Sequence, residues 1–198
     1  MNFKSFIFGI VLTFFLLGCK PTNEQLLDKA YALVQQKKYE KAIDVYTRVI
    51  KNNHKIQAAY YYRGRIYLQL QNYEKALADF DNVMSLQSRD GLIFTYNKNG
   101  IITNEEIRTQ IDYYDALYQR AQVKYYMDSL TSSFNDFETL VDKNLRKSNC
   151  LIWMGLIWSK KGDNDKACNY FKKSREFAVS DDDIRDANSM IKTNCKEQ

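Results

Sequence analysis

The chain has 198 residues, of which 45% are hydrophobic and 27% charged, a composition typical of one globular unit. One proline and seven glycines argue against long structureless segments. The formal net charge of +5 is too small to indicate a nucleic-acid-binding protein.

Residues 1–18 are predicted to be a cleaved signal peptide. Lys4 precedes an apolar run that ends at Leu17, and this run is shorter than the roughly 20 residues of a membrane-spanning helix. The sequence Leu-Leu-Gly before Cys19 resembles a bacterial lipobox, which implies cleavage before Cys19 and lipidation of that cysteine. Residues 19–22 would then form a short tether, and the mature chain would carry +4, from 28 basic and 24 acidic residues. The alternatives are an uncleaved anchor or an ordinary secretory signal.

From residue 23 to residue 179 the sequence repeats one helix-pair pattern. In one copy, Gly64, Ala76, Phe80 and Val83 recur at three- and four-residue spacing within two helical segments. This spacing indicates an antiparallel helix pair whose helices approach closely at the small residues. Shifts of 34 residues back, 57 forward and a further 34 forward place similar residues on the same positions. The matching sets are Ala30, Ala42, Tyr46 and Val49, then Ala121, Ser133, Phe137 and Leu140, then Gly155, Ala167, Phe171 and Ser174.

A 34-residue period with small residues at its eighth and twentieth positions, and an aromatic residue at its twenty-fourth, resembles the tetratricopeptide repeat. The resemblance implies an all-α solenoid of four helix-turn-helix repeats with one insertion, 91–113, after the second. The family's proline near the end of each repeat is absent, so the ends of the repeats are less sharply defined by the sequence. The expected repeats are 23–56, 57–90, 114–147 and 148–179.

In that family the first helix of each pair lines a concave groove, and tyrosine recurs at the matching positions of this chain. A tyrosine ring is amphipathic and has few rotatable bonds, which suits peptide recognition, and Arg65 can pair with a partner's carboxylate. The alternative is that some of these tyrosines only pack against the insertion or neighbouring helices. The resemblance thus implies a partner-binding groove that contains Tyr31, Tyr61, Arg65, Tyr118, Gln122 and Tyr125.

The insertion is the most individual segment of the chain. Its Asn99 and Gly100 predict a short hairpin turn, and Thr103 with Glu106 forms a capping box. Residues 95–106 also resemble an EF-hand calcium loop, but Glu106 is the only carboxylate at the usual ligand positions. We therefore favour the hairpin and predict no metal site.

The fourth repeat is rich in basic residues that alternate with Asp163, Asp165 and Glu176. This alternation favours a solvated face over a binding patch. The basic residues are Lys160, Lys161, Lys166, Lys172, Lys173 and Arg175.

Residues 180–198 are predicted to form a capping helix. Ser180 is followed by three aspartates, which suit the positive end of a helix dipole, and an apolar stripe then ends at Cys195. A helix that folds back at Ser180 brings Cys168 near Cys195, so a disulfide between them is expected in an oxidising compartment. Cys150 lies at the other end of its helix pair, so it is expected to remain outside the disulfide. The alternative is three buried thiols.

Features of an enzyme are scarce in the sequence. The single histidine, His54, falls in an expected turn between repeats, and no nucleophile-base arrangement, zinc spacing or phosphate-binding glycine loop is present. We expect neither catalysis nor a cofactor.

These patterns predict a membrane-anchored adaptor of the bacterial cell envelope, held by its lipid at the outer membrane and facing the periplasm. It would bind a peptide or helix of another envelope protein. Binding of nucleic acid or of a small-molecule substrate is not expected. Two alternatives remain open. One is a structural subunit of a permanent envelope assembly or secretion complex whose groove is filled from within, and the other is a calcium-responsive binder that uses the 95–106 loop.

Overall fold

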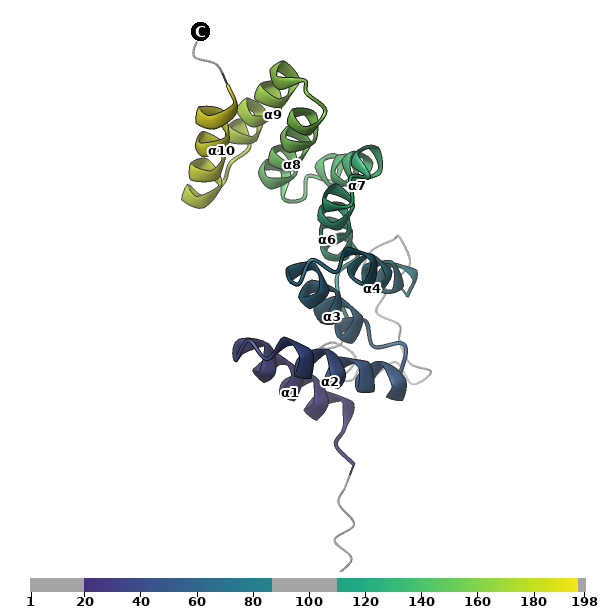
Figure 1. Cartoon of the computed structure of the whole chain (residues 1–198). Coiled ribbons are helices and arrows are strands. Elements are labelled where there is room, and N and C mark those ends of the chain that lie inside the picture. The colour runs from purple at the N-terminus through teal and green to yellow at the C-terminus, as the bar shows by residue number, and fades with distance from the viewer. Residues whose placement is uncertain (1–19, 87–109, 196–198) are drawn as a thin grey trace, which may run out of the picture.

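The computed structural model describes residues 20–86 and 110–195, and these form a chain of stacked helix pairs (Figure 1). The described residues contain nine helices and no strand. The predicted signal peptide, Cys19 and most of the insertion, including the 95–106 loop, lie outside them. The helices are α1 (Asn23–Gln35), α2 (Tyr39–Asn52), α3 (Gln57–Gln69), α4 (Tyr73–Ser85), α6 (Tyr113–Tyr126), α7 (Leu130–Asp142), α8 (Lys147–Lys160), α9 (Asn164–Glu176) and α10 (Asp181–Asn194). The prediction of an all-α repeat solenoid is confirmed.

Polar side chains start several of these helices. Thr22 and Gln25 form a capping box at the start of α1, and Asp112 accepts hydrogen bonds from the backbone N–H groups of Tyr114 and Asp115 at the start of α6. These side chains satisfy N–H groups that have no partner within the helix. Among the described helices, none is long and apolar enough to cross a membrane.

The turn within each pair has a left-handed residue at one shared position. Lys37, Gln71 and Asp128 adopt φ values of 57°, 57° and 61°, and Gly162 adopts 84°. Only the fourth pair uses glycine there, although glycine adopts this conformation with the least strain. The repeated turn geometry sets the same antiparallel packing in every pair.

The core is built from the same positions in each pair. The aromatic rings at the twenty-fourth repeat position are almost completely buried, as are the small residues across from them. Gly155 packs so tightly that an added Cβ would lie 2.5 Å from the Phe171 ring. The shared core residues are Ala30 and Tyr46, Gly64 and Phe80, Ala121 and Phe137, and Gly155 and Phe171.

Arginine–aspartate pairs connect the middle repeats to their neighbours. Arg63 on α3 donates two hydrogen bonds to Asp79 on α4, at 2.7 and 2.9 Å, and a third to Thr47 on α2. Arg120 on α6 makes the equivalent bonds to Asp136 on α7 and also contacts Asp81 on α4. Because each arginine joins three helices, it fixes the position of one repeat relative to the one before it.

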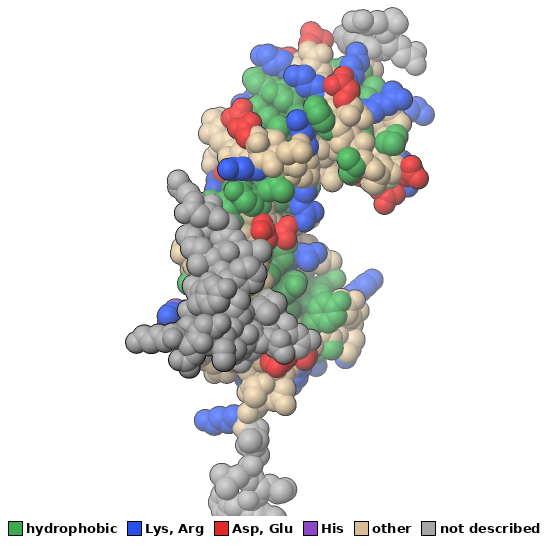
Figure 2. Space-filling view, turned by 180° about the vertical axis from the view of Figure 1, so that it is seen from behind, with side chains coloured by type: hydrophobic (Ala, Val, Ile, Leu, Met, Phe, Trp, Pro, Cys, Tyr) green, Lys and Arg blue, Asp and Glu red, His purple; other side chains and the backbone are tan. Residues whose placement is uncertain are grey.

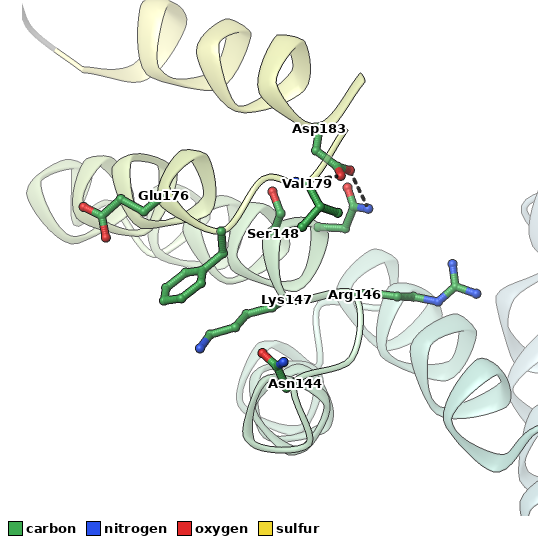
Figure 3. A pocket seen from close by; sticks show the side chains of 9 residues that line it. Asn144, Arg146, Lys147, Ser148, Glu176, Val179 and Asp183 are labelled. Atoms are coloured by element: carbon green, nitrogen blue, oxygen red, sulfur yellow. Dashed lines mark hydrogen bonds between the residues drawn. The ribbon is translucent and has the colours of Figure 1, made fainter. Parts of the chain in front are cut away.

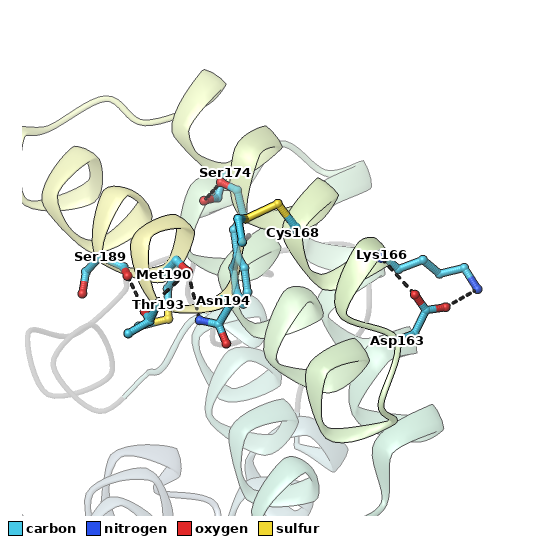
Figure 4. The surroundings of a disulfide bond; sticks show 10 residues. Asp163, Lys166, Cys168, Ser174, Ser189, Met190, Thr193 and Asn194 are labelled. Atoms are coloured by element: carbon cyan, nitrogen blue, oxygen red, sulfur yellow. Dashed lines mark hydrogen bonds and ion pairs between the residues drawn. A yellow bond between two sulfur atoms is a disulfide. The ribbon is translucent and has the colours of Figure 1, made fainter. Parts of the chain in front are cut away.

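The last helix covers the open end of the fourth repeat. Ser180 and Asp183 form a capping box at its start, and its Met190 and Ile191 pack near Phe171. Cys168 on α9 and Cys195 at the end of α10 form the expected disulfide, with S–S 2.07 Å (Figure 4). The helix therefore acts as the predicted cap and is tied covalently to α9.

Candidate functional site

The candidate groove lies along the first helices of the pairs. Figure 2 shows the molecule hollowed on one edge, and in Figure 1 this hollow lies beside α6, between α3 and α8. The six predicted groove residues come from α1, α3 and α6, but their exposure differs sharply, so they do not contribute equally to an accessible surface.

At the N-terminal end, Tyr31 and Arg65 are both exposed. The Tyr31 side chain is 58% exposed, and Arg65 stacks over the Tyr61 ring at 5.8 Å. No carboxylate among the described residues lies within ion-pair distance of Arg65. Both residues border a cavity of about 150 Å³ between α1 and α3, and Tyr46 and Tyr62 complete its aromatic lining.

Farther along the hollow, the predicted tyrosines are partly or fully packed. Tyr61 is only 9% exposed and lies against Tyr62 and Phe80. Burial raises the pKa of Tyr61, and the nearby Arg65 opposes this effect. Tyr61 therefore supports the surface rather than projecting from it.

Trp153, which was not among the predicted groove residues, contacts the tyrosines at the centre of the groove. The Trp153 indole N–H donates to the Tyr118 hydroxyl at 3.1 Å, and the Trp153 ring meets Tyr125 edge to face at 5.2 Å. Burial raises the pKa of Tyr118, although this indole hydrogen bond and nearby Gln122 oppose the rise. The signal for Trp153 is its place on the first helix of the fourth pair, one residue from a groove position.

Charged residues lie beside these rings. Arg146, just before α8, stacks over the Tyr118 ring at 5.3 Å and pairs with Asp115 on α6 at 2.5 Å. Lys160, at the end of α8, lies over Tyr125 and pairs with Asp128. Both cations already have carboxylate partners, unlike Arg65.

A second, larger cavity of about 350 Å³ lies at the C-terminal end, between the start of α8 and the α9–α10 connection. Figure 3 shows Lys147 and Val179 facing it, with Asp183 hydrogen-bonded to Asn149 at one side. Its wall mixes both signs of charge, because Arg146 and Lys147 line it together with Glu176 and Asp183. This mixture does not select one class of charged ligand.

Side chains suited to metal binding or nucleophilic attack lie apart from one another in the described part of the chain. In the described part of the chain, no three His, Cys, Asp or Glu side chains are placed to hold a metal ion. His54 is exposed, while Cys150 is buried, and burial raises its thiol pKa to about 12. A thiol with that pKa is a poor nucleophile at neutral pH.

Residues 27–83 match the sequence model of the tetratricopeptide repeat family. No curated protein matches the chain. Among solved structures, MamA from Desulfovibrio magneticus RS-1 has a TM-score of 0.62 at 19% identity, over 79% of this chain and 75% of that one. YrrB, described as a TPR protein with an unusual peptide-binding site, has a TM-score of 0.58 at 16% identity, over 87% of this chain and 76% of that one.

Proposed function

We propose that this chain, which has the fold of tetratricopeptide-repeat scaffolds for protein–protein interaction, is a lipid-anchored adaptor of a bacterial cell envelope. It binds a peptide or a helix of a partner protein along the hollow lined by α1, α3 and α6. The fold family is generally not enzymatic, and the described side chains are arranged for contact rather than for chemistry.

The observation that carries the proposal is the exposed pair of Tyr31 and Arg65 beside an aromatic cavity. An arginine held by stacking presents its N–H fork to solvent, where it can bind a carboxylate through two hydrogen bonds. Exposed tyrosine adds apolar contact area with little loss of rotamer freedom. YrrB, a protein of the same fold with a peptide-binding site, supports a peptide as the class of ligand.

The proposed cellular location rests on the sequence alone. The short apolar run before Cys19 and its resemblance to a lipobox support a lipid anchor at the outer membrane, with the repeats on the periplasmic side. Residues 20–22 separate Cys19 from α1, so the anchor would hold the first repeat close to the membrane.

The structural-subunit alternative is favoured by one observation. Tyr118 and Tyr125 pack on Trp153, so the central part of the hollow is already filled by the chain's own aromatic rings. In that case the partner contact would be permanent and would form at another surface.

The test is a pull-down from gently solubilised envelopes with the wild type and with Tyr31→Ala combined with Arg65→Ala. Tyr61 and Tyr118 are left unchanged because their loss would disturb the packing. Lys29→Ala combined with Lys41→Ala, two exposed residues of the first repeat, is the matched control. We expect the groove variant to lose a partner that the control retains. If the wild type and both variants retain the same partners, the function must lie on another surface, and the subunit alternative is favoured.

A further inference from the structure

The third and fourth repeats differ in net charge. Residues 114–147, the third repeat, contain five acidic and five basic residues, whereas residues 148–179, the fourth repeat, contain three acidic and six basic residues. The fourth repeat therefore carries a net charge of +3, whereas the repeat before it is neutral.

The fourth repeat also lacks the buried carboxylate of the middle repeats. Asp136 on α7 pairs with Arg120 and Lys124, and Asp79 on α4 pairs with Arg63. At the equivalent position the fourth repeat has Tyr170. Its basic residues therefore lack a buried counterion of this kind within their own repeat.

Instead, aromatic rings and lysines alternate over the fourth repeat. Trp158 on α8 meets Phe134 on α7 edge to face, and Phe134 meets Tyr170 on α9 in the same way. The ammonium groups of Lys161 and Lys166 lie 5.0 and 4.2 Å from the centre of the Trp158 ring. The Trp158 indole N–H has no hydrogen-bond partner among the described residues, so apolar and cation–π contacts hold this side chain.

The pattern continues along α9. Lys166, Tyr170, Lys173 and Phe177 follow one another at three- and four-residue spacing, so they share one side of the helix. At the far end, the Lys147 ammonium lies 3.7 Å from the centre of the Phe177 ring, which is 42% exposed. We name this the basic aromatic surface, made of Lys147, Trp158, Lys161, Lys166, Tyr170, Lys173 and Phe177.

Several of its cations lack a carboxylate partner. Lys166 pairs with Asp163 (Figure 4), but no carboxylate among the described residues lies within ion-pair distance of Lys147, Lys161 or Lys173. Figure 2 shows Lys and Arg side chains beside hydrophobic ones at this end of the molecule. An array of such cations next to apolar rings is complementary to an acidic segment that also carries apolar side chains.

We propose that the basic aromatic surface binds an acidic, apolar-containing segment of a partner protein, as a second contact apart from the Tyr31–Arg65 end of the hollow. A protein segment fits better than an anionic membrane plane because Asp181, Asp182 and Asp183 begin α10, directly after α9. A plane of anionic headgroups would meet these three carboxylates. A narrow segment can lie along Lys161, Lys166 and Lys173 and end before the cavity that Asp183 borders together with Lys147 and Phe177.

The test uses a fluorescent synthetic peptide of Glu-Glu-Leu repeats, with the Lys-Lys-Leu peptide as opposite-charge probe. Its anisotropy is followed with the full chain and with Lys161→Glu combined with Lys173→Glu. Lys29→Glu combined with Lys41→Glu, in the first repeat, makes the same change in net charge. Binding to an anionic membrane is measured separately, by sedimentation with vesicles of phosphatidylcholine and phosphatidylglycerol.

We expect the wild type to bind the Glu-Glu-Leu peptide in preference to the Lys-Lys-Leu peptide, and to bind more weakly as salt rises. The fourth-repeat reversal should weaken this binding about tenfold or more, while the first-repeat control stays within about twofold. Equal losses in both variants would show that only net charge matters and would overturn the proposal. Absence of peptide binding, or vesicle binding that depends on Lys161 and Lys173 without peptide binding, would overturn it as well.

Discussion

Arg120 binds Asp136 through two parallel hydrogen bonds, at 2.9 and 2.7 Å, and the pair recurs 57 residues earlier as Arg63 with Asp79. Both aspartates are nearly buried, so each depends on its arginine for compensation of its charge. Because Arg120 also contacts Asp81 in the preceding repeat, the pair helps to set the curvature of the hollow.

Removal of Arg120 should therefore be costly. Arg120→Leu leaves Asp136 buried with only Lys124 as a cation, and we expect a loss of about 3 kcal/mol in the free energy of unfolding. Arg175→Leu, at an exposed position of α9, should change it by less than about 0.5 kcal/mol. Urea unfolding measures both, and similar losses would mean that the buried pair has no special role.

The two helix-packing glycines should respond differently to alanine. In Gly155→Ala the new Cβ would meet the Phe171 ring at 2.5 Å, and we expect a loss of about 1 to 3 kcal/mol. In Gly64→Ala the nearest atoms lie at 3.1 Å, and the higher helix propensity of alanine offsets part of the strain. Thermal unfolding should rank Gly155→Ala as the less stable protein, and the reverse order would contradict the packing described.

The buried thiol should be unreactive in the folded chain. The Cys19→Ser variant leaves Cys150 as the single thiol outside the disulfide. Since burial raises its pKa to about 12, almost no thiolate is present at pH 8. Iodoacetamide should modify Cys150 slowly in buffer and quickly in urea, and fast modification of folded protein would disprove its burial.

The disulfide should stabilise mainly the C-terminal cap. Cys168→Ser combined with Cys195→Ser removes a cross-link between residues 27 positions apart. In the chain-entropy model, this cross-link stabilises the folded chain by about 3.5 kcal/mol. Hydrogen exchange should rise first in α10 and least in α3. Unchanged protection of α10 would show that its packing alone holds it.

The start of α10 should make stability depend on pH. Hydrogen bonds from Ser180 and neighbouring backbone groups lower the pKa of Asp183, so its carboxylate stabilises the folded chain above the ordinary pKa of aspartate. That stabilisation is lost as pH falls through the lowered pKa. Asp183→Asn should reduce stability near pH 7 by about 0.3 to 1 kcal/mol and have little effect near pH 2. Asp186→Asn, which lies outside the first turn, is the control for charge alone.

Most of the fold was predictable because it depends on residues that recur in register. The small residues at Ala30 and Gly64 and the rings at Tyr46 and Phe80 define the helix pairs through their spacing alone. The turns were less predictable, since Lys37 and Gln71 adopt left-handed conformations that such side chains rarely favour, and only Asp128 is of a residue type enriched there. Local sequence does not signal this geometry when packing imposes it.

The site was predictable only in outline. A repeat position assigns Tyr31, Tyr61 and Tyr118 to one side of the first helices, but the neighbouring helix decides which of them stays exposed. Tyr31 lies on the first described helix and is exposed, whereas Trp153 from the next pair engages Tyr118. The arginine–aspartate pairs were not predicted because their members lie 16 residues apart on different helices, although their recurrence after 57 residues is visible in the sequence.

The proposed function requires that the Tyr31–Arg65 end of the hollow contacts another protein. This contact can be tested with a photo-crosslinking amino acid at position 31 of the full chain, expressed in its native cells, with the same amino acid at exposed position 51 as control. We predict a discrete adduct with a second protein from position 31, lost on Arg65→Ala and absent from position 51. No adduct from position 31, or the same adduct from both positions, would show that this end of the hollow does not bind a partner.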